Sequence, residues 1–103
     1  MFETLKEKID FEYKVFLEML KALSRTEIIS RAFEIAYKEA LYRRLLDSLK
    51  ANSIAESTYK YMLLSESTLD QMYLSAKSNN LLKLENGDVP DYVWENILKA
   101  VMF

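Results

Sequence analysis

Any catalysis by this chain would depend on carboxylates, lysines and tyrosines, because its 103 residues include no histidine and no cysteine. Their absence excludes zinc fingers, thiol nucleophiles, disulfides and Ser-His-Asp triads. The acidic residues mostly lie beside a basic residue at helical spacing, as Glu27 does with Arg31 and Glu34 with Lys38. Such pairs are ordinary features of helix surfaces, and no acidic cluster has the spacing of metal ligands. We therefore expect a protein that is not an enzyme and has no metal ion and no cofactor.

Residues suited to binding another protein are more prominent. The chain has seven tyrosines, and Tyr42 is followed directly by Arg43 and Arg44 within a segment, 24–52, that has six basic and four acidic residues. Tyrosine and arginine are enriched among the residues that dominate binding energy at protein interfaces. The predicted protein-binding residues are Tyr42, Arg43, Arg44, Tyr59 and Tyr61.

The N-terminal helix has two apolar faces. Ile9 and Phe16 lie on one of them, whereas Phe11, Val15 and Met19 lie on the other. The helix could be buried between neighbours, or its second face could bind another molecule. We assign Phe11, Val15 and Met19 as the candidate self-association surface, through which the chain would form a homodimer.

The elements that must position these residues are helices. Glycine and proline occur once each, whereas sandwiches and barrels need many glycines in their turns. The pattern predicts an all-α fold, a single domain over residues 1–103, as a bundle of five or six helices with boundaries near 24, 40, 53, 67 and 89. Capping boxes at Ser24 with Glu27 and at Ser53 with Glu56 support two of these boundaries. A short extended segment is expected near 81–84.

The second helical segment changes its apolar face part-way along. Ile29 and Phe33 share one face, but from Leu41 onward the apolar residues point to the opposite side. Either the helix breaks near residues 39–42, or one long helix crosses between two cores; we favour the break. The predicted core consists of Ile9, Phe16, Leu20, Ile29, Phe33, Leu45, Leu63, Leu69, Met72, Tyr73 and Ile97.

The net charge of −2 and the short apolar runs bear on partners and location. Residues 54–64 and 68–78 have the length of a helix-turn-helix, so a small DNA-binding transcriptional regulator is the alternative function. Because duplex binding depends on basic residues, the charge argues against direct contact with nucleic acid. No apolar run could span a bilayer, no signal peptide is recognisable, and the lack of cysteine fits the cytoplasm.

One resemblance adds context. This resemblance to known proteins rests on four motifs: Ser24-x-x-Glu27-Ile28-Ile29, Ala32-Phe33-Glu34-Ile35 with Lys38-Glu39, Leu63-Leu64-Ser65 and Leu69-Asp70-x-x-Tyr73. Over about Phe11–Ala76 the chain resembles a family of short helical proteins of unknown function encoded in Firmicutes genomes, phages and mobile elements. The resemblance implies a non-catalytic protein-binding module that inhibits a host defence protein, in the manner of an anti-CRISPR protein that blocks a CRISPR nuclease. Its expected partner is therefore a host protein such as a CRISPR effector.

Overall fold

The computed structural model describes residues 2–101 and has six α-helices in this range. They are α1 (Leu5–Lys21), α2 (Arg25–Ser30), α3 (Ala32–Lys50), α4 (Glu56–Leu64), α5 (Thr68–Ser78) and α6 (Asp91–Val101). The all-α prediction is thus confirmed. Residues 81–84 have no regular secondary structure, so the possible extended segment there does not form a β-strand.

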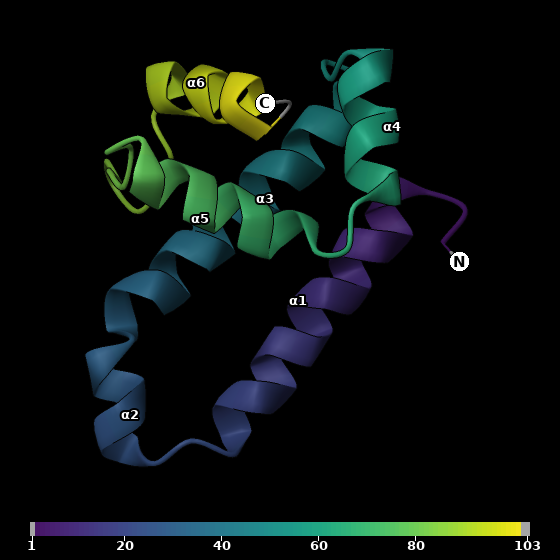
Figure 1. Ribbon diagram of the computed structural model, residues 1–103. Helices are drawn as coiled ribbons and strands as arrows, with labels where there is room; N and C mark the ends of the chain where they lie inside the picture. The colour runs from purple at the N-terminus through teal and green to yellow at the C-terminus, as the bar shows by residue number, and fades with distance from the viewer. Residues whose placement is uncertain (1, 102–103) are drawn as a thin grey trace.

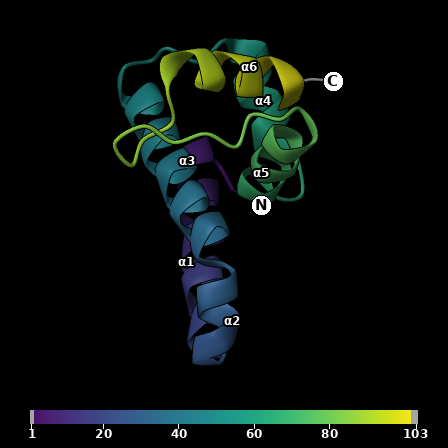
Figure 2. The ribbon, with the colours of Figure 1, turned by 90° about the vertical axis from the view of Figure 1, so that its left-hand side faces the viewer.

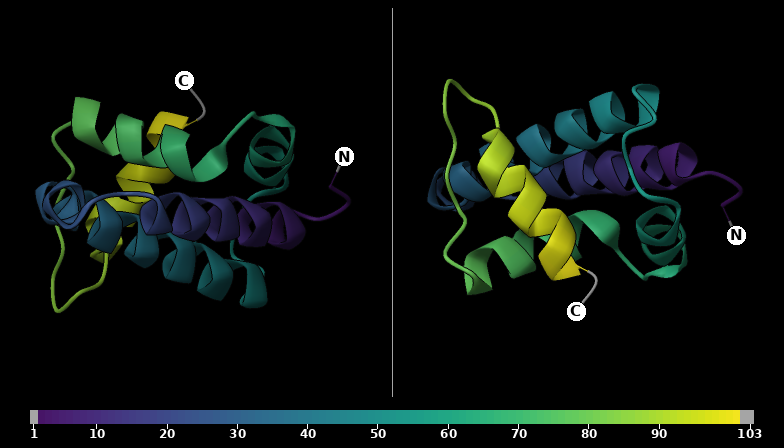
Figure 3. Two further views of the ribbon diagram at one scale, coloured as in Figure 1. Left: turned by 90° about the horizontal axis from the view of Figure 1, so that it is seen from below. Right: turned by 90° about the horizontal axis from the view of Figure 1, so that it is seen from above.

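The helices form a head and a projecting arm (Figures 1 and 2). In the head, α5 packs against α1, α3 and α6, and α6 lies diagonally across the end of the bundle when it is seen from above (Figure 3). The arm consists of the second half of α1, α2 and the first part of α3, which extend away from the other helices as a thin layer (Figure 2).

Several predicted helix ends are confirmed, and two are wrong. Ser24 caps α2 in a complete capping box with Glu27. By contrast, α4 begins after Ala55 without a side-chain cap, because the Ser53 hydroxyl donates to the Ser48 carbonyl at 3.2 Å instead. The break expected near 39–42 is also wrong, since α3 is continuous there, and the chain bends at Arg31.

The bend at Arg31 has a local cause. The hydroxyl of Ser30 donates to the carbonyl of Glu27 at 2.8 Å, and this kind of bond to the preceding turn competes with regular helical bonding and bends helices. The change of apolar face that suggested a break at 39–42 has another origin. The first turns of α3 lie in the arm, whereas Tyr37, Ala40, Leu41 and Leu45 lie in the core of the head.

The core belongs to the head alone. Its apolar side chains are Leu5, Ile9, Tyr37, Ala40, Leu41, Leu45, Met62, Leu69, Met72, Ala76, Val89, Val93, Trp94 and Ile97. Ile9, Leu45, Leu69, Met72 and Ile97 were predicted to be buried, and they are. Phe16, Leu20, Leu63 and Tyr73 are half-buried. Ile29 and Phe33 are 65% and 49% exposed, so their assignment to the core was wrong.

A two-residue turn leads the chain towards α6. Asn86 and Gly87 both have positive φ, at 53° and 77°, and the backbones of Glu85 and Asp88 exchange hydrogen bonds of 2.8 and 2.9 Å across them. This is the conformation that Asn-Gly favours in tight hairpins. The turn directs Val89 into the core.

Tyr37 connects α3 to the irregular segment before this turn. Its side chain is fully buried, and its hydroxyl donates to the Leu81 carbonyl at 2.8 Å. We predict that Tyr37→Phe lowers the free energy of unfolding by about 1 kcal/mol, because the hydrogen bond from the tyrosine hydroxyl is lost while the Leu81 carbonyl keeps its bond from the Lys83 amide. Urea denaturation should show this loss, and Tyr92→Phe, at a ring that is 51% exposed, should change stability by less than about 0.5 kcal/mol. Equal losses for the two variants would contradict the assignment.

Candidate protein-binding site

The tyrosines and arginines predicted to bind a partner mostly contact their own chain. The Tyr42 hydroxyl donates to Asp10 Oδ1 at 2.6 Å, and its ring stacks on Tyr13 with 4.3 Å between centroids. The hydrogen bond to Asp10, with burial as the second cause, raises the pKa of Tyr42 to about 12. The Tyr59 hydroxyl accepts from the Leu5 amide at 3.1 Å.

Arg43 and Arg44 hold the segment before α6 against α3. Arg43 Nη2 donates to the Gly87 carbonyl at 3.0 Å. Arg44 forms an ion pair with Asp91, and its guanidinium lies 5.9 Å from the centre of the Trp94 ring. These contacts are part of the fold, so the role of the two arginines in partner binding stays a prediction.

Tyr61 is the remaining residue of that predicted set. Its side chain is 43% exposed on α4. Its role at a partner surface also stays a prediction.

The arm has the composition of a core without being one. No residue from Asp10 to Ala36 is buried. Large apolar side chains that are 38–65% exposed nevertheless occur throughout it: Phe11, Val15, Leu17, Met19, Ile28, Ile29 and Phe33. Sequence periodicity shows which residues share a face, but it does not show whether another element covers that face, so the exposure of Ile29 and Phe33 could not be predicted.

The arm exposes its apolar side chains in two places. We call Phe11, Val15 and Met19, which follow one another along α1, the α1 stripe; this is the predicted self-association surface. We call Ile28, Ile29 and Phe33, which lie where α2 meets α3, the arm tip.

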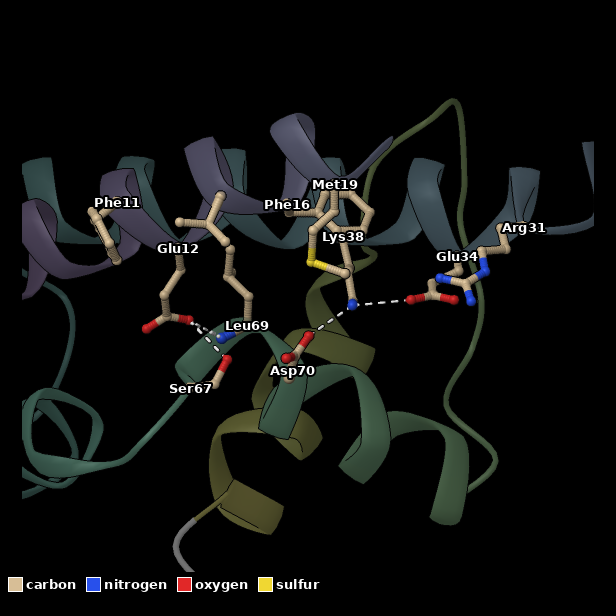
Figure 4. Close-up of a pocket in the computed structure, with 11 residues that line it drawn as sticks. Phe11, Glu12, Phe16, Met19, Arg31, Glu34, Lys38, Ser67, Leu69 and Asp70 are labelled. Carbon is tan, nitrogen blue, oxygen red and sulfur yellow. Dashed lines mark hydrogen bonds and ion pairs between the residues drawn. The ribbon is translucent and has the colours of Figure 1, made fainter. Parts of the chain in front are cut away.

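A groove of about 340 Å³ runs beside the α1 stripe (Figure 4). One wall is α1, and the other walls are the start of α5 and one side of the α2–α3 junction. The lining residues are Phe11, Glu12, Val15, Phe16, Met19, Arg31, Glu34, Lys38, Ser67, Leu69 and Asp70. The volume is at the lower end of the range for small-molecule sites, which is about 300–1,000 Å³.

Lys38 is the central cation of the groove. Its Nζ lies 2.7 Å from Asp70 Oδ1 and 3.0 Å from Glu34 Oε2 (Figure 4), and it also lies 4.7 Å from the centre of the Phe16 ring. Burial alone would lower the pKa of Lys38, but the hydrogen bonds to Asp70 and Glu34 outweigh burial and raise this pKa. Since a lysine nucleophile needs a lowered pKa, this protonated amine is suited to holding α3 and α5 together.

Glu12 caps α5 from a different helix. Its Oε1 accepts from the Leu69 amide at 2.9 Å and from the Ser67 hydroxyl at 3.3 Å. Ser67, which occupies the N-cap position of α5, makes no side-chain bond to the α5 backbone. A carboxylate at this position satisfies free amides and interacts favourably with the helix dipole.

Lys8 completes this polar network below the groove. Its side chain is almost fully buried, and its Nζ donates to the Met62 carbonyl, to Ser65 Oγ at 2.9 Å and to Thr68 Oγ1 at 2.8 Å. Glu12 Oε2, which has no hydrogen-bond partner among the described residues, lies 3.5 Å from the same nitrogen. Burial lowers the pKa of Lys8, and the charge of Glu12 opposes this shift. The spacing of Lys8 and Glu12 on the apolar face of α1 was the available sequence signal, and it was not recognised.

Two further findings concern the described part of the chain. Within residues 2–101, no three acidic side chains come close enough together to hold a metal ion. None of the helices in that range combines the length and the apolar character needed to cross a bilayer.

The comparisons with known proteins leave the site to be interpreted from its own residues. No family model, curated protein or solved structure matches the chain.

Proposed function

We propose that the chain is a non-catalytic protein-binding module that contacts its partner through the arm. One observation carries the proposal: from Asp10 to Ala36 the chain buries no side chain, yet it exposes seven large apolar ones there. Soluble proteins rarely leave more than a few hundred Å² of apolar surface open in one patch unless another molecule covers it.

The physical argument is one of stability. Ordering a residue costs about 1–2 kcal/mol of backbone conformational entropy, and burial of apolar area is the main term that offsets this cost. The arm has 27 residues between Asp10 and Ala36 and no core of its own. A partner that covers its apolar side chains would provide the missing burial.

The arm tip has the composition of an interface centre. Ile29 is the most exposed of its three apolar residues, and the Phe33 ring lies 5.9 Å from that of Tyr37. Arg25 and Arg31 flank the tip, and neither forms an ion pair within residues 2–101. The partner surface that fits is an apolar depression with acidic groups at its rim, because arginine can bind carboxylates in a bidentate manner.

The class of partner follows from the sequence resemblance. It implies a phage or mobile-element protein in the bacterial cytoplasm that inhibits a host defence protein, and CRISPR nucleases are the partners to test first. The groove supports a role in binding rather than in catalysis, because its amine, that of Lys38, is paired with two carboxylates.

The test is a variant of the arm tip. We expect Ile29→Asp to weaken partner binding by at least about 100-fold, since a carboxylate would have to be desolvated at the interface centre. The partner would be captured from nuclease-treated host lysate and then titrated by calorimetry. Leu74→Asp is the matched control, because Leu74 is 59% exposed on α5 in the head. The Leu74→Asp protein should bind the partner with the same affinity as the wild type.

Unchanged affinity of the folded Ile29→Asp protein would remove the arm tip from the proposal. If the chain instead bound naked duplex DNA with a steep dependence on salt concentration, the transcriptional-regulator hypothesis would replace this one.

A further inference from the structure

A row of exposed charged residues runs along α1 beside the α1 stripe. Its members are Glu7, Lys14, Glu18 and Lys21, which lie within about 60° of one another around the helix axis at 3.6 residues per turn. The row borders the solvent side of the α1 stripe, and the groove borders the other side. The exposed surface of α1 is therefore an apolar stripe with charges along one edge.

When two copies of this row run in opposite directions, each charge of one copy faces a charge of opposite sign on the other. From the N-terminus the signs are negative, positive, negative, positive. Two copies of α1 that pack antiparallel, with Val15 near the two-fold axis, bring the same edges of the two helices together. Glu7 then lies within two residues, about 3 Å along the axis, of the position facing Lys21 of the second copy, and Lys14 lies equally near the position facing Glu18 of the second copy. Long side chains can span this offset, so each negative charge can meet a positive one, in addition to the 3.1 Å ion pair between Lys21 and Glu18 within each chain.

The apolar residues follow the same symmetry. Val15 lies at the middle of the α1 stripe, with Phe11 and Met19 four residues away on either side. In the antiparallel pair Val15 packs near its own equivalent, and Phe11 packs near Met19 of the second copy. These three side chains are 41–56% exposed in the single chain, so the pairing would bury surface that the fold leaves open.

We infer that α1 is the interface of a symmetric homodimer, in which two copies pack antiparallel through the α1 stripe and the charged row. This inference goes beyond the proposed function, because it uses a different face of the arm and leaves the arm tip of each copy free for another protein. An interface of this kind is isologous, meaning that the same patch is used on both copies.

The expected affinity is moderate. α1 has 17 residues and is about 25 Å long, and one face of such a helix offers less than the about 800 Å² per partner of a standard interface. The dimer should therefore dissociate in the micromolar range. The second copy is also the one partner that is present wherever the chain is made.

The first experiment is sedimentation equilibrium of the full chain over a wide concentration range. We expect the wild type to pass from monomer to dimer, and Val15→Asp to remain monomeric. Leu74→Asp, with its change in the head, should dimerise like the wild type. A wild type that stays monomeric up to about 1 mM would overturn the inference, since a 1 mM dissociation constant corresponds to only about 4 kcal/mol.

A charge exchange tests the register without placing a charge on the α1 stripe. Lys14→Glu sets like charges against each other twice per dimer, so it should weaken the dimer by about tenfold at low salt. Lys14→Glu combined with Glu18→Lys exchanges the two signs and should restore the affinity. If the single variant dimerised like the wild type, or if the double variant stayed as weak as the single one, the antiparallel register would be wrong.

The absence of cysteine allows a direct check of direction. When Phe11→Cys and Met19→Cys proteins are mixed under mild oxidation, they should form a mixed disulfide, and neither variant should cross-link efficiently with itself. Cross-linking of each variant with itself would indicate a parallel pair and overturn the inference.

The arm-tip variant separates this inference from the proposed function. Ile29→Asp should dimerise like the wild type even though it no longer binds the other partner. Loss of the dimer in this variant would mean that the tip is the self-association surface, which would overturn the role of α1.

Discussion

Replacing Lys8 with alanine should lower the free energy of unfolding by about 3–5 kcal/mol. Lys8 is 3% exposed, and its amine is bonded to the Met62 carbonyl and to the hydroxyls of Ser65 and Thr68. Its removal leaves the buried carboxylate of Glu12 without its counter-charge. It also removes the charged donor from the Met62 carbonyl, which keeps only the hydroxyls of Ser65 and Thr68. The loss is a large fraction of the about 5–15 kcal/mol by which domains are usually stable. Urea denaturation monitored by circular dichroism measures it.

Two further variants make the test specific. Lys6→Ala removes a lysine of the same helix that is 63% exposed and paired with Asp10, so its effect should stay below about 1 kcal/mol. A second pair of variants replaces Lys8 with methionine, alone and together with Glu12→Gln. The double variant should lose less stability than Lys8→Met alone, because the neutral amide of the glutamine can still accept the bond from Leu69 and has no charge to be compensated. Similar losses for Lys6→Ala and Lys8→Ala would show that the buried network contributes little.

Alkaline pH should destabilise the fold between about pH 10 and pH 12. Burial raises the pKa of Tyr37 from the ordinary tyrosine value of 10.0 to about 12, and the bond to Asp10 raises the pKa of Tyr42 from 10.0 to about 12 as well. The unfolded chain then loses these protons at a lower pH than the folded chain. The stabilisation is complete below pH 10 and is lost as the pH rises through 12. By linkage it is at most about 2–3 kcal/mol for Tyr37, and it is smaller for Tyr42, because solvent screens the bond of this part-buried side chain to Asp10.

Lysines titrate in the same region with opposite signs. Lys8, with its lowered pKa, makes the fold more stable as the pH approaches 10.5, whereas Lys38, with its raised pKa, makes it less stable above that pH. The tyrosines should dominate the sum. Urea midpoints measured from pH 8 to pH 12 should fall steeply, and Tyr37→Phe and Tyr42→Phe should each flatten the fall. A profile that is flat over this interval in the wild type would contradict the assignment.

Local interactions explain the features of the fold that could be predicted from the sequence. The capping box of Ser24 and the turn at Asn86 and Gly87 depend on groups within four residues of one another, and both are present. Ile9, Met72 and Ile97 lie on apolar faces that other helices of the head cover. In these cases the local pattern and the tertiary packing agree.

The predictions that were wrong concern features in which the local pattern and the tertiary packing disagree. Ile29 and Phe33 share an apolar face with correct helical spacing, but no other element of the chain lies over it, so both are exposed. The local sequence predicts that Arg43 and Arg44 are free to bind a partner. Their hydrogen-bond acceptors lie in the segment 87–91, more than 40 residues away along the chain, so the local sequence does not reveal them. The capping of α5 by Glu12 could not be predicted either, since it joins residues 57 positions apart.

The absence of buried side chains between Asp10 and Ala36 also bears on how such a protein evolves. Substitutions at exposed positions usually change stability by less than about 0.5 kcal/mol, so the arm can vary while the head keeps its fold. If the arm binds a partner as proposed, its binding surface could thus change one residue at a time. Selection for stability would act mainly on residues 5–9 and 37–97, which supply the core, and selection for recognition would act on the segment between them.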